Sequence, residues 1–506
     1  MNKTCVLFAL IAVLFIQSLS AQDLKITKSD NIIKGSKTLD LTIAGYSKDY
    51  IYVYRNLETN IEVFKFEKNT LNLKESSTLS LKLNEEDSKK KTPALNSVVV
   101  TKTNIIIFTS IYYKDEDVNH LFARSFDFDL KPIGEWFKVE SITAKKSKDA
   151  GTFSISISRD SSKILVVKTE PFEKKGKEKL SFSVFDENLK KLVSENENLE
   201  YEDHKITIQS HWIAEDGTIY FIIKLTGDAD NGFKIYRFVS TSENETSQTK
   251  FEFTLRTKNL KAIKFESNTT GDLLIAGFYS NPKSYFVDGV FSAWIMKSNQ
   301  QPGEIDPFYS DSISAEMMGV YIIDKLVILP DKSFMMVTEN RVVESRWVSD
   351  GVTGTSTLTT IYNENDIVYF KVSANGQIAE HYKLLKSSES KSTNNRYLSY
   401  FILFDGDNKI VFYNEHKKNF EPHKKRYLVP VKDVYQDELF DHEWENRVFA
   451  YATFINGNTT PNILLKEKEE NYALMPRHAL QISPGEVVLL GHHKKDYVLY
   501  KITVTN

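Results

Sequence analysis

The sequence predicts an all-β fold, a β-propeller of eight blades that is closed by a strand from the N-terminal region. Three observations lead to this prediction: short apolar runs recur along the chain, a shared segment repeats, and the last repeat lacks one strand. The eight apolar runs lie at 50–54, 105–108, 164–167, 219–222, 273–276, 334–337, 410–413 and 487–490.

Each apolar run is short, rich in β-branched and aromatic residues, and bounded by Gly, Asp or Asn. Runs of this kind are typical of strands that are buried on both faces. A second strand with alternating polarity follows each run. One complete unit reads as four strands, at 153–158, 164–168, 180–185 and 191–201.

A repeated segment gives the length of the unit. FDFDLK at 126–131 and FDENLK at 185–190 align without gaps, and FEKNTL at 66–71 is a less exact copy. The first residues of these segments are 60 and 59 positions apart. A period of this length with four strands per unit is typical of propeller blades and longer than the repeats of most solenoids.

The two ends of the chain indicate how the ring closes. The last unit supplies three strand-like pieces, at 479–482, 487–490 and 497–504, and the region 24–33 is the candidate for the fourth. The spacing lengthens after Met318; if one hairpin there is an insertion, the ring has seven blades instead of eight. Helical periodicity is scarce, and 438–449 is the one stretch where we expect a helix.

The N-terminus predicts export. Lys3 precedes an apolar run at 6–16 that is too short to cross a bilayer, and the small residues Ser18, Ser20 and Ala21 follow it. We therefore expect a signal peptide at 1–21 and a single propeller domain at 22–506, in the periplasm or secreted. A membrane anchor is the alternative.

Composition excludes several function classes. Cys5 is the only cysteine and lies in the predicted leader, so the mature chain has no disulfide, thiolate metal site, cysteine nucleophile or lipoprotein acceptor. The net charge of −3 gives no reason to expect nucleic acid as a partner. No other hydrophobic segment of spanning length is present, so we expect a soluble protein after cleavage, and a monomer.

One turn carries a family resemblance. Ser158-Arg159-Asp160-Ser161 before the apolar run at 164–167 resembles the serine, proline, aspartate, glycine turn of extracytoplasmic bacterial propellers of the WD40-like and TolB-like kind. Related turns lie at 215–217 and 329–332. The resemblance implies a binding platform and names no ligand.

Loop lengths distinguish the two faces of the predicted ring, because successive hairpins open on opposite faces. Turns between first and second strands are short, whereas several turns between second and third strands are long. We therefore expect the binding surface on the long-loop face. The long loops are 169–179, 278–290, 338–366 and 414–425.

The candidate binding residues lie in two of these loops. Arg341, Glu344, Arg346 and Trp347 lie in the longest, where Trp offers a flat apolar platform beside the donors of Arg. The alternative is an extra hairpin that packs its own Trp. The loop at 279–294 contributes two further candidates, although its aromatic residues are also suited to fastening the loop itself. These are Tyr285 and Asp288.

No motif for a cofactor or catalytic metal appears. There is no glycine-rich phosphate loop, zinc-spaced histidine pair or nucleophile elbow. His492 and His493 are adjacent and chelate poorly, and His416 and His423 flank a lysine-rich loop that repels cations.

A calcium site is equally unsupported. Asp228, Asp230 and Asn231 begin like a calcium loop, but Gly232 stands where an oxygen ligand is required. We expect no metal and no cofactor.

Three hypotheses for function remain. The first is a non-enzymatic propeller that binds an envelope protein, a peptide or a glycan through the long-loop face. The second is a carbohydrate-active hydrolase or lyase with paired carboxylates at the channel mouth, for which Asp288, Glu344 and Asp366 are the first residues to inspect. The third is a structural scaffold of the envelope.

Overall fold

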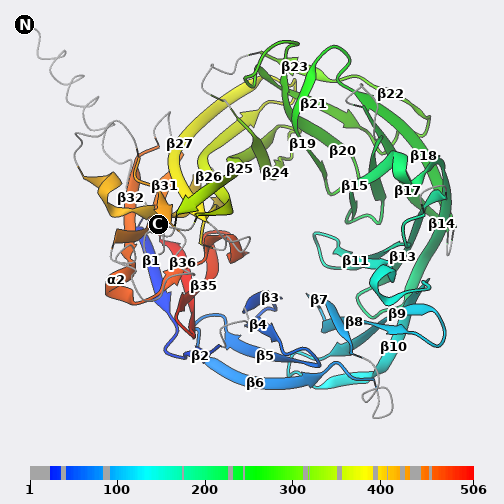
Figure 1. Cartoon of the computed structure of the whole chain (residues 1–506), viewed down its shortest axis with the longest axis horizontal. Coiled ribbons are helices and arrows are strands. Elements are labelled where there is room, and N and C mark those ends of the chain that lie inside the picture. The colour runs from blue at the N-terminus through cyan, green and yellow to red at the C-terminus, as the bar shows by residue number, and fades with distance from the viewer. Residues whose placement is uncertain are drawn as a thin grey trace, which may run out of the picture.

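The computed structural model shows eight β-sheets arranged in a ring around a central axis (Figure 1). It describes residues 23–35, 41–83, 92–173, 176–225, 232–242, 245–311, 317, 319–349, 356–390, 397–406, 408–421, 428–432, 446–454 and 459–505. The predicted signal peptide, the calcium-like residues 228–231, His423 and most of the predicted helix lie outside these ranges.

Each sheet is one blade, and we number the blades in chain order. Blades 1 to 4 consist of β3 (Thr42–Tyr46), β4 (Tyr50–Asn56), β5 (Asn60–Glu67) and β6 (Leu73–Ser80); β7 (Ala94–Val100), β8 (Ile105–Tyr113), β9 (Val118–Phe126) and β10 (Pro132–Thr143); β11 (Thr152–Ile157), β12 (Lys163–Thr169), β13 (Lys177–Asp186) and β14 (Lys191–Glu202); and β15 (Ile206–Ile213), β16 (Ile219–Leu225), β17 (Gly232–Ser242) and β18 (Glu245–Thr254), to which β22 (Gly303–Ile305) adds a short parallel strand.

Blades 5 to 8 complete the ring. They consist of β19 (Asn259–Ser267), β20 (Leu273–Ser280), β21 (Gly289–Ile295) and β23 (Phe308–Ser310); β24 (Tyr321–Ile328), β25 (Phe334–Ser349), β26 (Ser356–Val372) and β27 (Ile378–Ser390), with β30 (Val431–Lys432) beside β27; β28 (Tyr400–Asp405), β29 (Asn408–His416), β31 (Arg447–Thr453) and β32 (Pro461–Lys466); and β33 (Ala473–Leu474), β34 (Leu480–Ser483), β35 (Glu486–His493), β36 (Asp496–Thr505), β1 (Asp23–Lys28) and β2 (Ile33–Lys34).

Helical structure is limited to single turns. They are the helix α2 (Glu467–Glu470) and the 3-10 turns Ser147–Asp149, Asp203–Lys205, Lys417–Phe420 and Pro476–His478. The helix predicted at 438–449 is wrong in its described part, because Arg447–Phe449 belong to β31. These residues continue the apolar face that pairs with β29, so tertiary packing overrides the local periodicity.

The eight predicted apolar runs are all second strands of blades, so the predicted blade number is confirmed. Successive side chains of these strands point to opposite neighbours. In β12, Ile164 and Val166 pack in the core cluster shared with blade 2, whereas Leu165 and Val167 pack in the cluster shared with blade 4. Burial on both faces is why these strands read as continuous apolar runs.

The ring closes as the sequence predicts. β1 pairs antiparallel with β36 over its whole length, so Leu24 lies opposite Val504 and Ile26 opposite Ile502. A core cluster also joins blade 8 to blade 1, including Leu490 and Ile51. The strand from the N-terminal region thus completes the last blade, and the core is continuous around the ring.

The repeated segment is a turn between the third and fourth strands. Asp127 and Asp186 each accept two backbone N–H hydrogen bonds through one carboxylate oxygen, at 2.9 Å. Leu130 and Leu189 have positive φ angles of 59° and 62°, and Leu71 in the less exact copy has 60°. The spacing shared by the three segments therefore reflects one turn geometry used in three blades.

Candidate functional site

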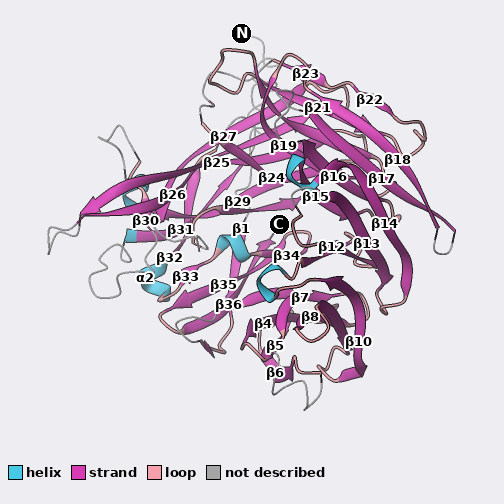
Figure 2. Cartoon of the chain, turned by 45° about the vertical axis from the view of Figure 1, so that its right-hand side comes forward, coloured by secondary structure: helices cyan, strands magenta, loops and turns pink. Residues whose placement is uncertain are grey.

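The long-loop face carries one projecting element, the hairpin of β25 and β26. This corrects the prediction of a loop at 338–366, because most of that stretch is strand. β24 begins at Tyr321 opposite Asn340, and β27 ends at Ser390 opposite Tyr362. Beyond these points β25 and β26 pair only with each other, and they extend past the rest of the ring (Figure 2).

One side of this two-stranded ribbon is apolar and exposed. Trp347 lies directly opposite Leu358, and Val343 lies on the same side because it is four residues from Trp347 in one strand. Their exposed fractions are 63% for Val343, 70% for Trp347 and 57% for Leu358. We call these three residues the apolar ribbon patch. The alternative in which the hairpin packs its own Trp is not what the structure shows.

The other side of the ribbon is mostly polar, apart from Val342 and the buried Ile361. Arg346 lies 2.5 Å from a carboxylate oxygen of Glu389 in β27 and 3.8 Å from Glu344. Asn363 donates a hydrogen bond to Glu344 at 3.3 Å. The pKa of Arg346 is raised by its hydrogen bond to Glu389. These contacts anchor the ribbon to β27 and leave the apolar side facing outward.

Arg341 lies at the root of the hairpin, away from its tip. Its guanidinium is 3.0 Å from Glu339 and 2.8 Å from Asp324 of the inner strand β24. It also donates to Ser399, just before β28, at 3.4 Å. Glu364 of β26 lies 3.8 Å away.

Further charged residues extend this buried network. Lys386 lies 2.8 Å from Glu339, and both side chains are 0% exposed. Arg477, in the turn before β34, lies 2.6 Å from Glu364. The network therefore joins blades 6, 7 and 8 beneath the hairpin.

Burial perturbs the acids of this region. It raises the pKa of Glu364 to about 7, and the nearby Glu339 carboxylate adds to the effect. Burial likewise raises the pKa of Glu415 to about 7, against the lowering effect of hydrogen bonds from His416 and Asn419. We interpret the network as the support of the hairpin, since its polar atoms are directed at one another.

The second candidate loop, between β20 and β21, is organised by Asp288. Its carboxylate accepts hydrogen bonds from the backbone N–H of Asn281 at 2.6 Å and from the hydroxyl of Ser284 at 3.0 Å. Tyr285 is 85% exposed and does not fasten the loop. Asp288 thus has a structural role, and Tyr285 is an exposed aromatic residue of this loop, as is Phe286 at 37%.

The remaining acidic and histidine candidates are also engaged. Asp366 lies 3.0 Å from Lys383, and His416 accepts a backbone hydrogen bond from Lys418 at 3.2 Å. The His492 ring packs against Tyr497. Within the described ranges, no group of three or more His, Cys, Asp or Glu residues is placed to hold a metal ion.

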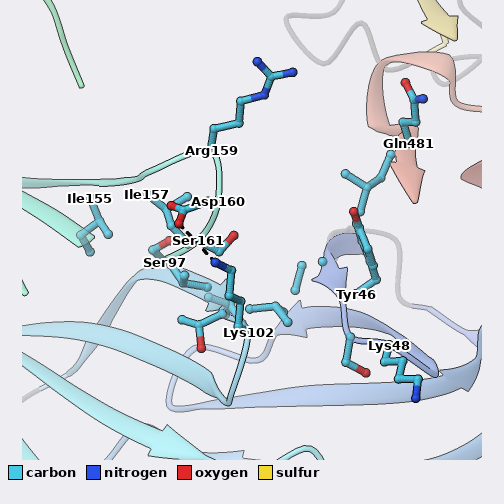
Figure 3. Close-up of a pocket in the computed structure, with 18 of the residues that line it drawn as sticks. Tyr46, Lys48, Ser97, Lys102, Ile155, Ile157, Arg159, Asp160, Ser161 and Gln481 are labelled. Atoms are coloured by element: carbon cyan, nitrogen blue, oxygen red, sulfur yellow. Dashed lines mark hydrogen bonds and ion pairs between the residues drawn. The ribbon is translucent and has the colours of Figure 1, made fainter. Parts of the chain in front are cut away.

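Two cavities lie on the face of the ring opposite to the β25–β26 hairpin, where the short turns between first and second strands gather. One, of about 850 Å³, is lined by β3, β7, β11 and the turns that follow them (Figure 3). The other, of about 480 Å³, is lined by β15, β19 and β24 and by the turn that follows β11. Ile157 and Arg159 line both cavities, so the two cavities adjoin each other. We call the two together the channel mouth.

Sequence reasoning missed this mouth, and a periodic signal was available. Lys48, Lys102 and Arg159 each stand two residues after the end of the inner strand in three successive blades. Asp288, Glu344 and Asp366 line neither of the two cavities. Arg159 lies in the turn that resembles the serine, proline, aspartate, glycine turn, at the position of the proline.

Hydrogen bonds fix that turn. Ser158 and Ser162 donate to one carboxylate oxygen of Asp160 at 2.7 and 2.9 Å, and Lys102 lies 3.2 Å from the other. Although partial burial opposes it, these hydrogen bonds hold the pKa of Asp160 well below its usual range. Asp160 therefore stays ionised and engaged, while Arg159 beside it extends into the open mouth (Figure 3).

No helix among the described residues is long and apolar enough to cross a membrane.

The likeness of this chain to known proteins is in structure and is distant. No protein-family model matches the chain, and no curated protein matches its sequence. Among solved structures, the Dos1 propeller is similar with a TM-score of 0.34 and 9% identity, over 76% of this chain and 88% of that one.

Two further structures illustrate the range of the likeness. The propeller domain of the Trilobed protease from Pyrococcus furiosus has a TM-score of 0.28 and 10% identity, over 64% of this chain and 95% of that one. Prolyl oligopeptidase B from Galerina marginata has a TM-score of 0.35 and 9% identity, and the match covers 94% of this chain but 56% of that enzyme. By its strand pairing, the present chain is an eight-bladed β-propeller.

Proposed function

We propose that this chain is an exported, non-catalytic binding propeller that holds a partner protein through the β25–β26 hairpin on its long-loop face. The observation that carries the proposal is the apolar ribbon patch of Val343, Trp347 and Leu358, which projects beyond the ring with each side chain more than half exposed. Exposed apolar clusters of this kind mark protein interaction sites.

Three physical arguments support the binding of a partner protein at the hairpin. An isolated two-stranded ribbon is marginally stable in water, so a third layer against its apolar side stabilises it. Trp is among the residues that contribute most to protein interfaces. The buried charge network holds the root of the hairpin in place, which reduces the ordering cost of binding.

Export remains part of the proposal and has its own test. We expect intact-mass analysis of the protein recovered from its native source to give a mature N-terminus at Gln22. A chain that retains residues 1–21 would contradict it.

Affinity capture tests the binding role. The wild-type chain is used to capture proteins from the native envelope fraction beside three variants: Trp347→Ala, a hairpin in which Asn-Gly replaces 345–360, and Phe172→Ala. Phe172 is a matched control because it is an aromatic residue with 68% exposure on another loop of the same face.

We expect one protein to be captured by wild type and Phe172→Ala and lost from both hairpin variants. With that protein purified, Trp347→Ala is expected to weaken binding by roughly 30-fold, the effect of an interface residue that contributes about 2 kcal/mol. Equal capture by all four chains would refute the proposal and favour a scaffold role. Turnover of a glycan panel would instead favour the hydrolase hypothesis.

A further inference from the structure

The channel mouth formed by the two cavities is cationic, although the whole chain carries a net charge of −3. Six basic residues line it against three acidic ones, Asp160, Glu215 and Glu266. The basic residues are Lys48, Lys68, Lys102, Arg159, Lys264 and Lys325. Concentrating positive charge in a concave site raises the local concentration of anions.

Four of these cations form no hydrogen bond or ion pair with any residue in the described ranges. They are Lys48, Arg159, Lys264 and Lys325, and the last three are near enough to Glu266 to interact with its charge. In contrast, Lys68 donates to the carbonyl of Ile482 at 3.0 Å and Lys102 lies 3.2 Å from Asp160. Arg159 extends into the open space between the turns (Figure 3). These groups are therefore available to a ligand.

The lysines of the smaller cavity lie close enough to repel each other. Lys264 is on β19 and Lys325 is on β24, which are neighbouring inner strands. Partial desolvation lowers the pKa of Lys325, although the residue remains exposed in part, and the charge of Lys264 lowers it further. Burial also raises the pKa of Glu266, which weakens one carboxylate beside them, and the other, Asp324, lies 2.8 Å from Arg341. A bound anion relieves this repulsion.

The rest of the lining suits a peptide better than a sugar or a bare oxyanion. Ala44, Val98, Val100, Ile155 and Ile157 give the larger cavity an aliphatic wall. Sugar sites more often offer exposed aromatic rings that are free to stack. Trp212 in the smaller cavity stacks on Tyr220, with ring centroids 5.4 Å apart, and Tyr46 in the larger cavity, although 40% exposed, has its ring centroid 4.8 Å from the ammonium of Lys68.

The backbone of the wall points to the same ligand. Six consecutive residues, 97–102, line the larger cavity, so it is the edge of β7 that faces it. β7 and β11 are the innermost strands of their sheets and have an open edge. Edge strands present backbone donors and acceptors that pair with an extended peptide. The cavity volumes of about 850 and 480 Å³ are in the range of ligand sites.

We propose that this channel mouth binds an acidic peptide segment, whose carboxylates contact Arg159, Lys264 and Lys325 while its backbone lies along the inner strand edges. The site is on the opposite face from the β25–β26 hairpin and is independent of it. A chain with both sites is able to hold two partners at once.

Fluorescence anisotropy with a fluorescein-labelled hexaglutamate peptide tests the proposal on the mature chain. We expect saturable binding that weakens as NaCl rises from about 0.1 to 1 M, because the Debye length falls from about 10 to 3 Å. Arg159→Glu and Lys325→Glu are each expected to weaken binding about tenfold or more, the effect of losing one charge-assisted hydrogen bond.

The matched control is Lys138→Glu, a charge reversal of an exposed lysine on the outer strand β10, which is expected to change affinity less than twofold. Equal thermal midpoints for the variants exclude loss of folding. Trp347→Ala is expected to leave peptide binding unchanged, which separates this site from the hairpin.

Three results would overturn the proposal. They are no saturable binding of hexaglutamate, equal weakening by Arg159→Glu and Lys138→Glu, and tighter binding of a hexameric polyuronate or of polyphosphate than of the peptide. The last result would assign the mouth to a different class of anion.

Discussion

Replacing Lys386 by Met is expected to destabilise the propeller by about 3 kcal/mol. The ammonium of Lys386 lies 2.8 Å from Glu339 and 3.0 Å from the backbone carbonyl of Glu364, and the side chains of Lys386 and Glu339 are fully buried. Met retains most of the apolar contact area but leaves the Glu339 charge short of one partner. Breaking a buried pair costs about 3–5 kcal/mol, and the remaining contact with Arg341 at 3.0 Å places the effect at the lower end.

The measurement is equilibrium unfolding in guanidinium chloride, followed by circular dichroism and by tryptophan fluorescence. Unfolding entropy of about 2.1 cal/mol/K per residue gives roughly 1 kcal/mol/K for a chain of this length, so the same change lowers Tm by about 3 °C. Adding Glu339→Gln to Lys386→Met is expected to restore more than half of the loss, because the uncompensated charge disappears.

The control for solvent-exposed lysine is Lys138→Met, with an expected change within about 0.5 kcal/mol. A loss below about 1 kcal/mol for Lys386→Met, or no recovery in the double variant, would show that the buried network does not support the hairpin root as described.

Three other predictions concern pH, close packing and ring closure. Burial raises the pKa of Glu415 from 4.5 to about 7, so its contribution to stability is complete below about pH 4.5 and is lost as the pH rises through 7. Glu415→Gln is expected to match the wild type in Tm at pH 4.5 and to be more stable than the wild type at pH 8, by up to about 3 kcal/mol of unfolding free energy. An equal difference at both pH values would contradict this. Gly277→Ala is expected to lower Tm by several degrees, because its Cβ would lie 2.1 Å from the carbonyl of Ala262, whereas Gly303→Ala, with no atom within 4 Å, serves as the neutral control. Deleting 23–28 exposes the edge of β36, and we expect concentration-dependent aggregation by light scattering where the intact chain stays dispersed.

Much of the fold was predictable because each second strand is buried between two neighbouring blades. That environment requires apolar residues at every position, as in Ile164 to Val167, and it produces a signal that short sequence windows detect. The closing strand at 23–28 was predictable from a missing piece in the last blade. Both features could be predicted from local sequence patterns together with a count of the strands in each unit.

The extent of the β25–β26 hairpin was not predictable in the same way. Its end is exposed on both sides, so Glu344, Arg346 and Trp347 alternate without a buried face to enforce a pattern, and the stretch resembles a loop. Pairing between strands, which no local window contains, determines its length.

The buried network and the cationic mouth were missed for a different reason. Glu364 and Arg477 are 113 residues apart in sequence and meet only because blades 6 and 8 enclose blade 7. The lysines of the channel mouth were in principle predictable from the sequence, since Lys48 and Lys102 occupy the same position in consecutive repeats. A comparison of residues at equivalent blade positions would have found them.

The seam between β1 and β36 sets the order in which the chain is able to fold. Asp23 and Thr505 are 482 residues apart, and the hydroxyl of Thr505 donates to the Asp23 carbonyl at 2.7 Å. The earliest strand of the described fold is therefore the last to find its neighbour. Contacts so distant in sequence form slowly, and until they form, the newly made protein exposes an unpaired strand at each end.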